Sequence, residues 1–327
     1  MKILLIGGSG YIGTVVASHF LYKNYEVHVL DNFIYDNKSF LKSFFFTNKI
    51  EILDQSLEIS LKNNDYDLIV ILSGLVGDPI TKKYPLLSKI HNNYEIKNFL
   101  SIINDNFSKK FIFISTCSNY GLNDSNILLD ENCNLNPLSL YAKEKVGIEN
   151  YLSSNKWKFH YTILRFATAF GHSPRMRFDL TINEFTKLYF EKKEFEVYDS
   201  ETWRPYCHTT DFARAIEAIL HADLDLVSNE IFNVGSNKNN FTKQMIIEEI
   251  NKYFKHNYVK YKNKGVDQRN YKVDFSKIKK ILNFEPEKDL SHGINEIIIN
   301  LSSNRYENIE NSKLYGNYFI KEDEENN

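Results

Sequence analysis

The sequence predicts an α/β protein in which helices cover both faces of a parallel β-sheet. Short apolar segments alternate with amphipathic segments as far as about residue 170, a glycine-rich turn follows the first apolar segment without a spacer, and acidic or hydroxyl residues end several apolar segments. Such alternation implies right-handed crossovers between parallel strands. Ligands on these sheets bind at the carboxyl ends of the strands, so the functional site is expected there.

The glycine-rich turn carries the clearest signal, because a strand precedes it, a helix follows it and the next strand ends at Asp31. Gly7 permits the tight turn, Gly10 lets the backbone approach a pyrophosphate, and Gly13 lets the helix pack closely on the strand. Free N–H groups at the helix start face the anion. Asp31 accepts hydrogen bonds from an adenosine ribose and repels a 2′-phosphate, so the motif predicts a site for NAD rather than NADP.

The remaining elements follow from apolar periodicity. Strands are predicted at residues 2–6, 27–30, 50–53, 67–72, 110–115 and 159–166, with helices at 84–107 and 137–153. Beyond these, helices are expected near 177–192, 209–222, 242–255 and 288–302, and strands near 195–198, 230–234 and 257–260. We therefore predict a Rossmann-type, doubly wound domain over residues 1–170 and a smaller C-terminal α/β substrate-binding lobe over 171–304, which exchanges segments with it. The polar tail, 305–327, is expected to fray.

The composition indicates a globular protein, with 327 residues of which 43% are hydrophobic and 25% charged. A formal net charge of −2 provides no global basic field for nucleic acid or an anionic membrane. Cys117, Cys133 and Cys207 form no pairing pattern and no C-x-x-C motif, so no metal site is expected. No apolar run reaches the roughly 18 residues of a spanning helix, and the first strand begins at Lys2. A cytoplasmic protein is expected.

Tyr141 and Lys145 are the predicted catalytic pair, because an i, i+4 spacing places them on one helix face. The spacing alone means little, since two other Tyr/Lys pairs share it. Thr116, at the end of the preceding strand, singles this pair out, because a hydroxyl there can converge with the tyrosine beside a nicotinamide. An ordinary tyrosine has a pKa of about 10, so acting as a base at neutral pH requires roughly 4 kcal/mol of preferential phenolate stabilisation. Lys145 and the positive nicotinamide ring are the available cations.

Together these motifs resemble the extended short-chain dehydrogenase/reductases, and within them the NAD-dependent nucleotide-sugar epimerase/dehydratase family. The resemblance spans residues 1 to about 290 and rests on Gly7-x-x-Gly10-x-x-Gly13, Asp31, Asp54, Ser115-Thr-Cys-Ser-Asn-Tyr-Gly121, Tyr141-x-x-x-Lys145 and Arg204-Pro-Tyr-Cys-His-Thr-Thr-Asp211. It implies NAD as the cofactor, a nucleotide sugar as the substrate, and a homodimer formed by the helices at 84–107 and 137–153.

The resemblance also implies roles for individual residues. Asp54 would hold the adenine amino group, and Thr116 the sugar oxygen at the reacting carbon. Arg204 would clamp the diphosphate of the nucleotide sugar, a role that suits a planar forked donor. The full set expected to line the cofactor site is Gly7, Gly10, Tyr11, Ile12, Gly13, Asp31, Asn32, Asp54, Leu72, Ser73, Gly74, Tyr141, Lys145 and Phe166.

Three further polar residues are expected at the substrate. Asn183, at the start of the helix after residue 170, and Arg269 are expected to contact phosphates or the base. Arg175 lies in the cation-rich loop 171–180, which resembles that of nucleotide-sugar enzymes in bacterial surface-glycan pathways.

The residues around Thr116 bear on which reaction follows oxidation at C4. A 4,6-dehydratase usually carries an Asp-Glu pair straight after the threonine, whereas Cys117-Ser118 stands here, which disfavours dehydration. A 3,5-epimerising reductase needs a cysteine and a histidine beside the ring. Cys117 lies one position from the usual place and is expected to be a packed thiol, with His172 a loop residue. His208 is expected to be structural.

Our first hypothesis from the sequence is C4 dehydrogenation of a nucleotide sugar, with a GDP-linked heptose or hexose of a capsule or lipopolysaccharide pathway as the substrate. A 4-epimerase stays open, because epimerisation needs only room for the 4-keto sugar to rotate. A 4-keto-sugar reductase is a third possibility. A non-catalytic NAD-binding regulator is the alternative from another class, and it would not need Thr116, Tyr141 and Lys145.

Overall fold

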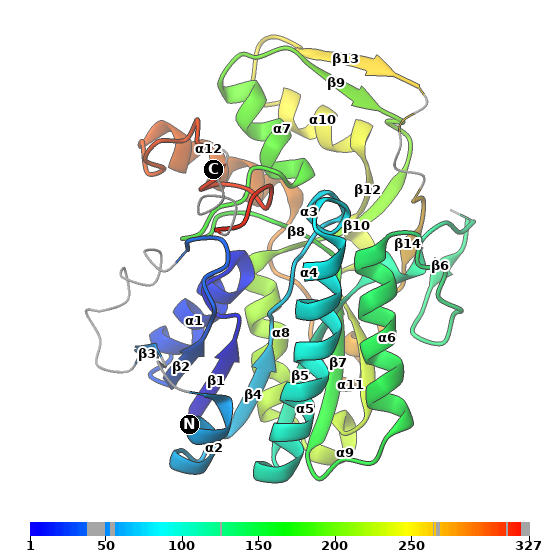
Figure 1. Ribbon diagram of the computed structural model, residues 1–327. Coiled ribbons are helices and arrows are strands. Elements are labelled where there is room, and N and C mark those ends of the chain that lie inside the picture. Colours follow the sequence, from blue (N-terminus) through cyan, green and yellow to red (C-terminus); the bar gives the residue numbers. More distant parts are fainter. Residues whose placement is uncertain are drawn as a thin grey trace.

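The computed structural model describes residues 1–37, 50–52, 56–124, 126–263, 265, 269–311 and 313–321, and its main element is a parallel sheet (Figure 1). Its strands lie side by side in the order β11-β7-β5-β4-β1-β2-β3. Their bounds are β1 Lys2–Ile6, β2 Glu26–Leu30, β3 Ile50–Ile52, β4 Leu68–Ile71, β5 Lys110–Thr116, β7 His160–Phe166 and β11 Glu230–Val234. Every neighbouring pair is parallel, as predicted.

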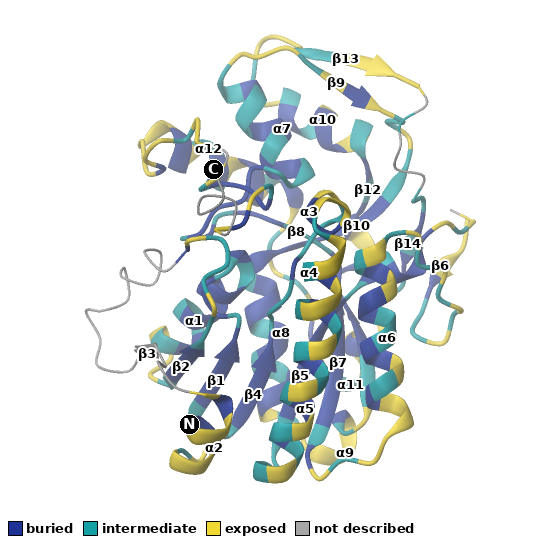
Figure 2. Ribbon diagram, in the orientation of Figure 1, coloured by how far each residue is buried: buried dark blue, intermediate teal, exposed yellow. Residues whose placement is uncertain are grey.

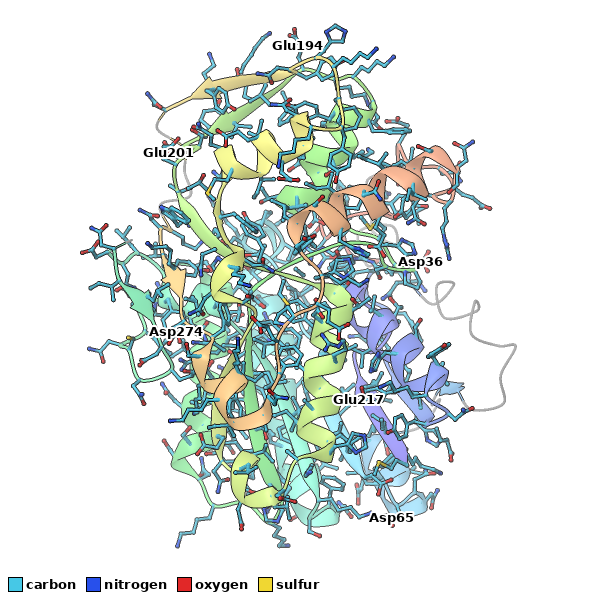
Figure 3. All side chains as sticks on the ribbon, turned by 180° about the vertical axis from the view of Figure 1, so that it is seen from behind. Asp36, Asp65, Glu194, Glu201, Glu217 and Asp274 are labelled. Atoms are coloured by element: carbon cyan, nitrogen blue, oxygen red, sulfur yellow. The ribbon has the colours of Figure 1, made fainter. Side chains whose placement is uncertain are left out.

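Alternating side chains of the strands supply two hydrophobic cores, one on each face of the sheet. Ile3 and Leu5 belong to one core, whereas Leu4 and Ile6 belong to the other. The first core is covered by α1 (Tyr11–Tyr22) and α8 (Thr209–His221), which Figure 3 shows side by side with Glu217 labelled. The second is covered by α2 (Leu57–Asn63), α5 (Glu95–Asn106) and α6 (Leu140–Ser154). Figure 2 shows buried strands between helices whose outer faces are exposed.

The helix predicted over residues 84–107 is not uniform. It consists of α4 (Pro85–Lys89), a π-helical turn (Ile90–Tyr94) and α5. A π-turn inserts one residue into the helical repeat and is found frequently at functional sites. Here it carries Asn92, which is 1% exposed and faces the loop after β4.

The smaller lobe lies over the carboxyl ends of the strands (Figure 1). Its main elements are β8 Thr168–Phe170, α7 Thr181–Phe190, β9 Phe195–Tyr198, β10 Trp203–His208, β12 Asn240–Thr242, α10 Lys243–Asn251, β13 Val259–Lys262 and α12 Leu290–Ser302. Two short pieces, β6 Leu128–Leu129 and β14 Lys272–Val273, pair beside it. The chain returns to the large sheet with α8, α9 (Leu224–Val227), β11 and α11 (Ser276–Leu282). Within the described ranges, no helix combines the length and apolarity needed to cross a membrane.

The expectation that the chain frays from about Arg305 is wrong for its described part, residues 305–311 and 313–321. Tyr306 and Tyr315 are buried in a cluster that includes Tyr11 of α1, and Ile320 is buried against Leu75. Three apolar side chains thus anchor a segment whose average composition is polar.

A buried ion pair ties α6 to the sheet. The carboxylate of Glu149 accepts hydrogen bonds from Arg165 of β7, with the closest contact at 2.7 Å, and the two side chains are 3% and 4% exposed. Ser115 and Asn119 also donate to Glu149, so the carboxylate is fully partnered. Because Glu149 lies one turn beyond Lys145, this pair fixes the helix that carries the predicted catalytic residues.

We predict that Glu149→Gln lowers the free energy of unfolding by about 3–5 kcal/mol, because it leaves the Arg165 charge buried without a counter-ion. Denaturant unfolding followed by circular dichroism measures the change. Glu58→Gln is the matched control, because Glu58 and Lys62 form a pair whose side chains are 53% and 59% exposed. That control should change stability by less than about 1 kcal/mol, and a similarly small effect of Glu149→Gln would contradict the prediction.

Candidate active site

The glycine-rich turn has the geometry that the sequence predicts. Gly7 has a φ of +83°, and a Cβ added there would lie 2.5 Å from the backbone nitrogen of Ser73. A Cβ on Gly13 would lie 2.7 Å from the backbone of Gly8, so only glycine lets α1 approach the turn this closely. A Cβ added to Gly10, in contrast, would lie 3.8 Å from its nearest neighbour, the Gly7 carbonyl oxygen, which leaves space over the first turn of α1. The turn therefore fits a dinucleotide pyrophosphate at the helix N-terminus.

The ribose side of the turn is built around Asp31, directly after β2. Its carboxylate accepts hydrogen bonds from the N–H groups of Ser9 at 3.0 Å and Phe33 at 2.8 Å, which fix it beside the glycine turn. Asn32 is exposed and caps the backbone of Ile34 at 3.2 Å. Asp54, the residue expected to hold the adenine, lies outside the described residues.

The loop after β4 lies against the glycine turn at Gly7 and carries Leu72, Ser73 and Gly74. Leu72 donates its N–H to Ile6 at 2.8 Å, and Gly74 has a φ of +135°. The hydroxyl of Ser73 is buried without a hydrogen-bond partner among the described residues, so it can serve a ligand. Phe166 ends β7 and is 4% exposed, because its ring packs in the core; its predicted cofactor contact stays a prediction.

Thr116, Tyr141 and Lys145 converge as predicted. Thr116 is the last residue of β5, and α6 begins at Leu140 because the Ser139 hydroxyl caps it by accepting the Ala142 N–H at 3.2 Å. The phenol of Tyr141 hydrogen-bonds with Thr116. Lys145 is 2% exposed, donates to the carbonyl of Ile114 at 2.8 Å, and lies 6.0 Å from the centre of the Tyr141 ring.

Asn92 joins this helix to the cofactor loop, a role that the sequence analysis missed. Its amide accepts the N–H of Leu75 at 2.7 Å and donates to the Leu75 carbonyl at 3.0 Å. It also donates at 2.8 Å to Glu144, which is on α6 next to Lys145. One feature of the sequence could have indicated this role. Asn92 is a polar residue on the apolar face of the predicted helix, four positions before the core residue Ile96.

A second missed residue is Asp78, at the start of α3 (Asp78–Lys83). One of its carboxylate oxygens pairs with Arg269 at 3.0 Å, and the other is buried without a hydrogen-bond partner in the part of the chain described. Arg269 also donates to the Ser118 hydroxyl at 3.4 Å. Asp78 lies close enough to Tyr141 to raise the pKa of its phenol. An ion pair from two distant segments therefore borders the catalytic tyrosine.

The structure assigns different surroundings to the two arginines of the loop 171–180. Arg175 is 1% exposed and donates to Asn317 at 2.7 Å, so it faces the C-terminal segment. Arg177, which the sequence analysis did not select, pairs with Asp179 at 2.5 Å and lowers the pKa of Tyr141. Of the two arginines, Arg177 is therefore the one whose charge favours the phenolate of Tyr141.

Asn183 and Arg204 are held by other parts of the protein. Asn183 donates to the Tyr11 hydroxyl and to the Arg177 carbonyl, both at 2.9 Å, so both of its amide hydrogens are used. Arg204 is 7% exposed, donates to the carbonyls of Trp203 and Arg269, and stacks 5.3 Å from the Tyr271 ring centre. Contact of either residue with substrate phosphates stays a prediction.

The alternative acid/base residues are engaged elsewhere. Cys117 is 1% exposed and donates to the Arg165 carbonyl, which confirms a packed thiol. His172 bonds to Tyr306 at 2.8 Å, and His208 caps α8, which confirms its structural role. In the described ranges, no three His, Cys, Asp or Glu side chains are grouped so that they could hold a metal ion.

A family model described as the NAD dependent epimerase/dehydratase family matches residues 3–235. The chain belongs to this family. NAD is therefore its cofactor, as the glycine turn and Asp31 predict. Among relatives, a UDP-glucuronate 4-epimerase of Thermodesulfobacterium geofontis is 27% identical, covering 95% of this chain and 99% of the relative. A protein of Bacillus subtilis described as an uncharacterized UDP-glucose epimerase is 27% identical, covering 93% and 98%.

Solved structures of this family share the fold. The UDP-glucuronic acid 4-epimerase of Bacillus cereus, in complex with UDP-glucuronic acid and NAD, superposes with a TM-score of 0.82 at 22% identity, covering 93% of this chain and 99% of that one. The dTDP-glucose 4,6-dehydratase of Streptomyces venezuelae, with NAD bound, superposes with a TM-score of 0.82 at 20% identity, covering 93% and 98%. The Rossmann-type prediction is confirmed.

The protein alone disfavours the phenolate form of Tyr141. Burial and the charge of Asp78 raise the pKa of Tyr141, while Arg177 and the hydrogen bond with Thr116 lower it less. Burial also lowers the pKa of Lys145 to about 8. Lys145, one of the two cations expected to stabilise the phenolate, donates its ammonium to the Ile114 carbonyl and lies 6.0 Å from the centre of the Tyr141 ring. The nicotinamide ring of bound NAD would add a second cation that favours the phenolate.

We predict that Asp78→Asn shifts the acidic limb of the pH–rate profile to lower pH. The Asp78 charge raises the pKa of Tyr141, so its removal lowers that pKa, and more phenolate is present at a given acidic pH. The readout is kcat measured across pH values.

Asp65→Asn is the control, because Asp65 is a carboxylate at the opposite end of the sheet, paired with Lys109 at 2.8 Å (Figure 3). Its profile should match that of the unmodified enzyme. An Asp78→Asn limb that stays in place or moves to higher pH would show that this charge does not act on the catalytic base.

Proposed function

We propose that this chain is an NAD-dependent epimerase that acts at C4 of a nucleotide-activated sugar. The observation that carries the proposal is the convergence of Thr116, Tyr141 and Lys145 beside the glycine turn, with Cys117 and His172 engaged elsewhere. A tyrosine base and a hydride acceptor are sufficient for oxidation and re-reduction at one carbon. Dehydration and 3,5-epimerisation need further acids or bases.

In the proposed reaction, bound NAD supplies the hydride acceptor and a positive ring beside the phenol. Tyr141, as the phenolate, accepts the proton of the C4 hydroxyl, while the C4 hydrogen leaves as hydride. Thr116 holds the C4 oxygen through its hydroxyl. Once the 4-keto sugar has rotated, Tyr141 would return the proton to the C4 oxygen, and the reduced cofactor would supply the hydride to the other face of C4, so no net oxidation occurs.

The nucleotide-sugar substrate is proposed from the relatives and from the charges at the site. The Bacillus cereus epimerase and a second structural neighbour were both solved with UDP-glucuronic acid and NAD. Arg204 and Arg269 are the cations that we propose for the diphosphate, as Arg204 lies against Arg269 at the edge of the cleft. Arg175 and Asn183 were predicted to bind the substrate directly. We propose instead that they hold the loop 171–180 in place and so position Arg177. A homodimer through α5 and α6 is also proposed.

C4 dehydrogenation of a GDP-linked heptose in a surface-polysaccharide pathway is the second candidate. It is favoured by the cation-rich loop 171–180, which contributes Arg177 beside Tyr141. The relatives named above support the epimerase better, since they are described as UDP-glucose and UDP-glucuronate epimerases. A 4-keto-sugar reductase would instead consume added NADH.

A panel of UDP-, GDP- and dTDP-sugars, incubated with the enzyme and NAD, separates these reactions. We predict a new C4 stereoisomer by NMR with no accumulation of NADH absorbance at equilibrium. Stoichiometric NADH with a 4-keto product would establish the dehydrogenase instead. Turnover only on addition of NADH and a 4-keto sugar would establish the reductase.

We predict that Tyr141→Phe lowers kcat by about 10²–10⁴-fold while leaving NAD binding intact, because only the acid/base hydroxyl is lost. Tyr258→Phe is the matched control, since Tyr258 and Lys262 have the same i, i+4 spacing but lie in the lobe. Retained activity in Tyr141→Phe would refute the assignment of the base, and so would an equal loss in both variants.

A further inference from the structure

Residues 313–321, which we call the C-terminal strap, join loops that lie beside the glycine turn. In Figure 1 this red segment lies between the lobe and the Rossmann-type domain. It contacts three segments that are far apart in the sequence: the loop 171–180, the loop after β2 and the loop after β4. Those segments border the site of the dinucleotide.

Tyr315 anchors the first part of the strap. Tyr315 is 7% exposed and packs in one apolar cluster with Tyr11 and with Ile12, whose N–H groups begin the helix that faces the pyrophosphate. The carbonyl of Tyr315 accepts the N–H of Phe178 at 2.7 Å, which joins the strap to the loop that carries Arg177.

Asn317 is the central contact of the strap and is 6% exposed. Its amide oxygen accepts from Arg175 at 2.7 Å, and its amide nitrogen donates to the Val76 carbonyl at 3.0 Å. Its backbone N–H donates to Asp179 at 3.3 Å. One side chain therefore links the loop after β4 with the arginine loop. Arg175 also stacks 5.1 Å from the ring centre of Tyr35, in the loop after β2.

The end of the strap contacts the loop after β2 and the loop after β4. The N–H of Lys321 donates to the carbonyl of Ile34 at 2.8 Å, three residues after Asp31. Ile320 is 4% exposed and packs with Leu75 and Ile80. The strap thus spans from the ribose side of the cleft, at Ile34, to the loop after β4.

We infer that the strap is the outer wall of the dinucleotide site and keeps NAD(H) bound through successive turnovers. A cofactor lying between the glycine turn and the loop after β4 has the strap across its exit. Release then requires the Asn317 and Lys321 hydrogen bonds and the Tyr315 and Ile320 contacts to open. This inference rests on NAD binding and not on the proposed sugar chemistry, and it favours a reaction that returns the hydride before the cofactor leaves.

The test is the rate at which NADH leaves the protein, with no sugar present. The full-length protein is loaded with NADH and mixed with excess NAD, and the loss of protein-bound NADH fluorescence gives the release rate. A chain ending at Ser312, which lacks the strap, and the point variant Asn317→Ala, which removes both side-chain links, are each expected to release NADH at least tenfold faster. A chain ending at Lys321 is the truncation control and should match the full-length protein.

Circular dichroism and thermal unfolding establish that each variant is folded. Release rates within twofold of the full-length rate, in the folded strapless chain or in folded Asn317→Ala, would overturn the inference. Faster NADH binding with unchanged release in the strapless chain would also overturn it, because the strap would then exclude the cofactor instead of retaining it.

Discussion

The common direction of the seven strands is the constraint on which the site depends. Because all neighbouring pairs are parallel, the glycine turn after β1, Asp31 after β2, the loop after β4 and Thr116 at the end of β5 open at one edge of the sheet. Crossover helices then bring α6, and with it Tyr141, to the same edge. Cofactor and catalytic groups meet there without any strand having to reverse.

Burial at this edge disfavours the charged forms of Tyr141 and Lys145. In the low-dielectric environment the pKa of Tyr141 rises and that of Lys145 falls to about 8. The phenol of Tyr141 is therefore weakly ionised in the protein alone. Arg177 and the hydrogen bond with Thr116 act in the opposite direction, and the positive ring of bound NAD would do the same. In the proposed reaction, the tyrosine would therefore act as a base only when NAD is bound, which would link proton transfer to the presence of a hydride acceptor.

The strand-end rule explains which parts of the site could be predicted. The rule located the glycine turn and Asp31, and it placed Thr116 near Tyr141. Apolar periodicity shows where each strand ends, and the ends of parallel strands lie at one edge of the sheet. Asp78, at the start of α3, pairs with Arg269, which lies far from it in the sequence. A contact between such distant segments leaves no local sequence pattern. The loop 171–180 has no regular periodicity, so the sequence could not show which of Arg175 and Arg177 lies near Tyr141. Asn92 lies in a π-helical turn, and the apolar periodicity of residues 84–107 predicts an uninterrupted helix there.

The C-terminal strap follows in the chain every segment that it contacts. The sheet, the helices and the lobe can therefore fold during synthesis before residues 313–321 are made, since domains form as the chain emerges. If the strap encloses the dinucleotide, as inferred above, its site is uncovered during that interval. The coenzyme could then enter a growing chain from the side that the strap later covers, without the contacts of the strap having to open.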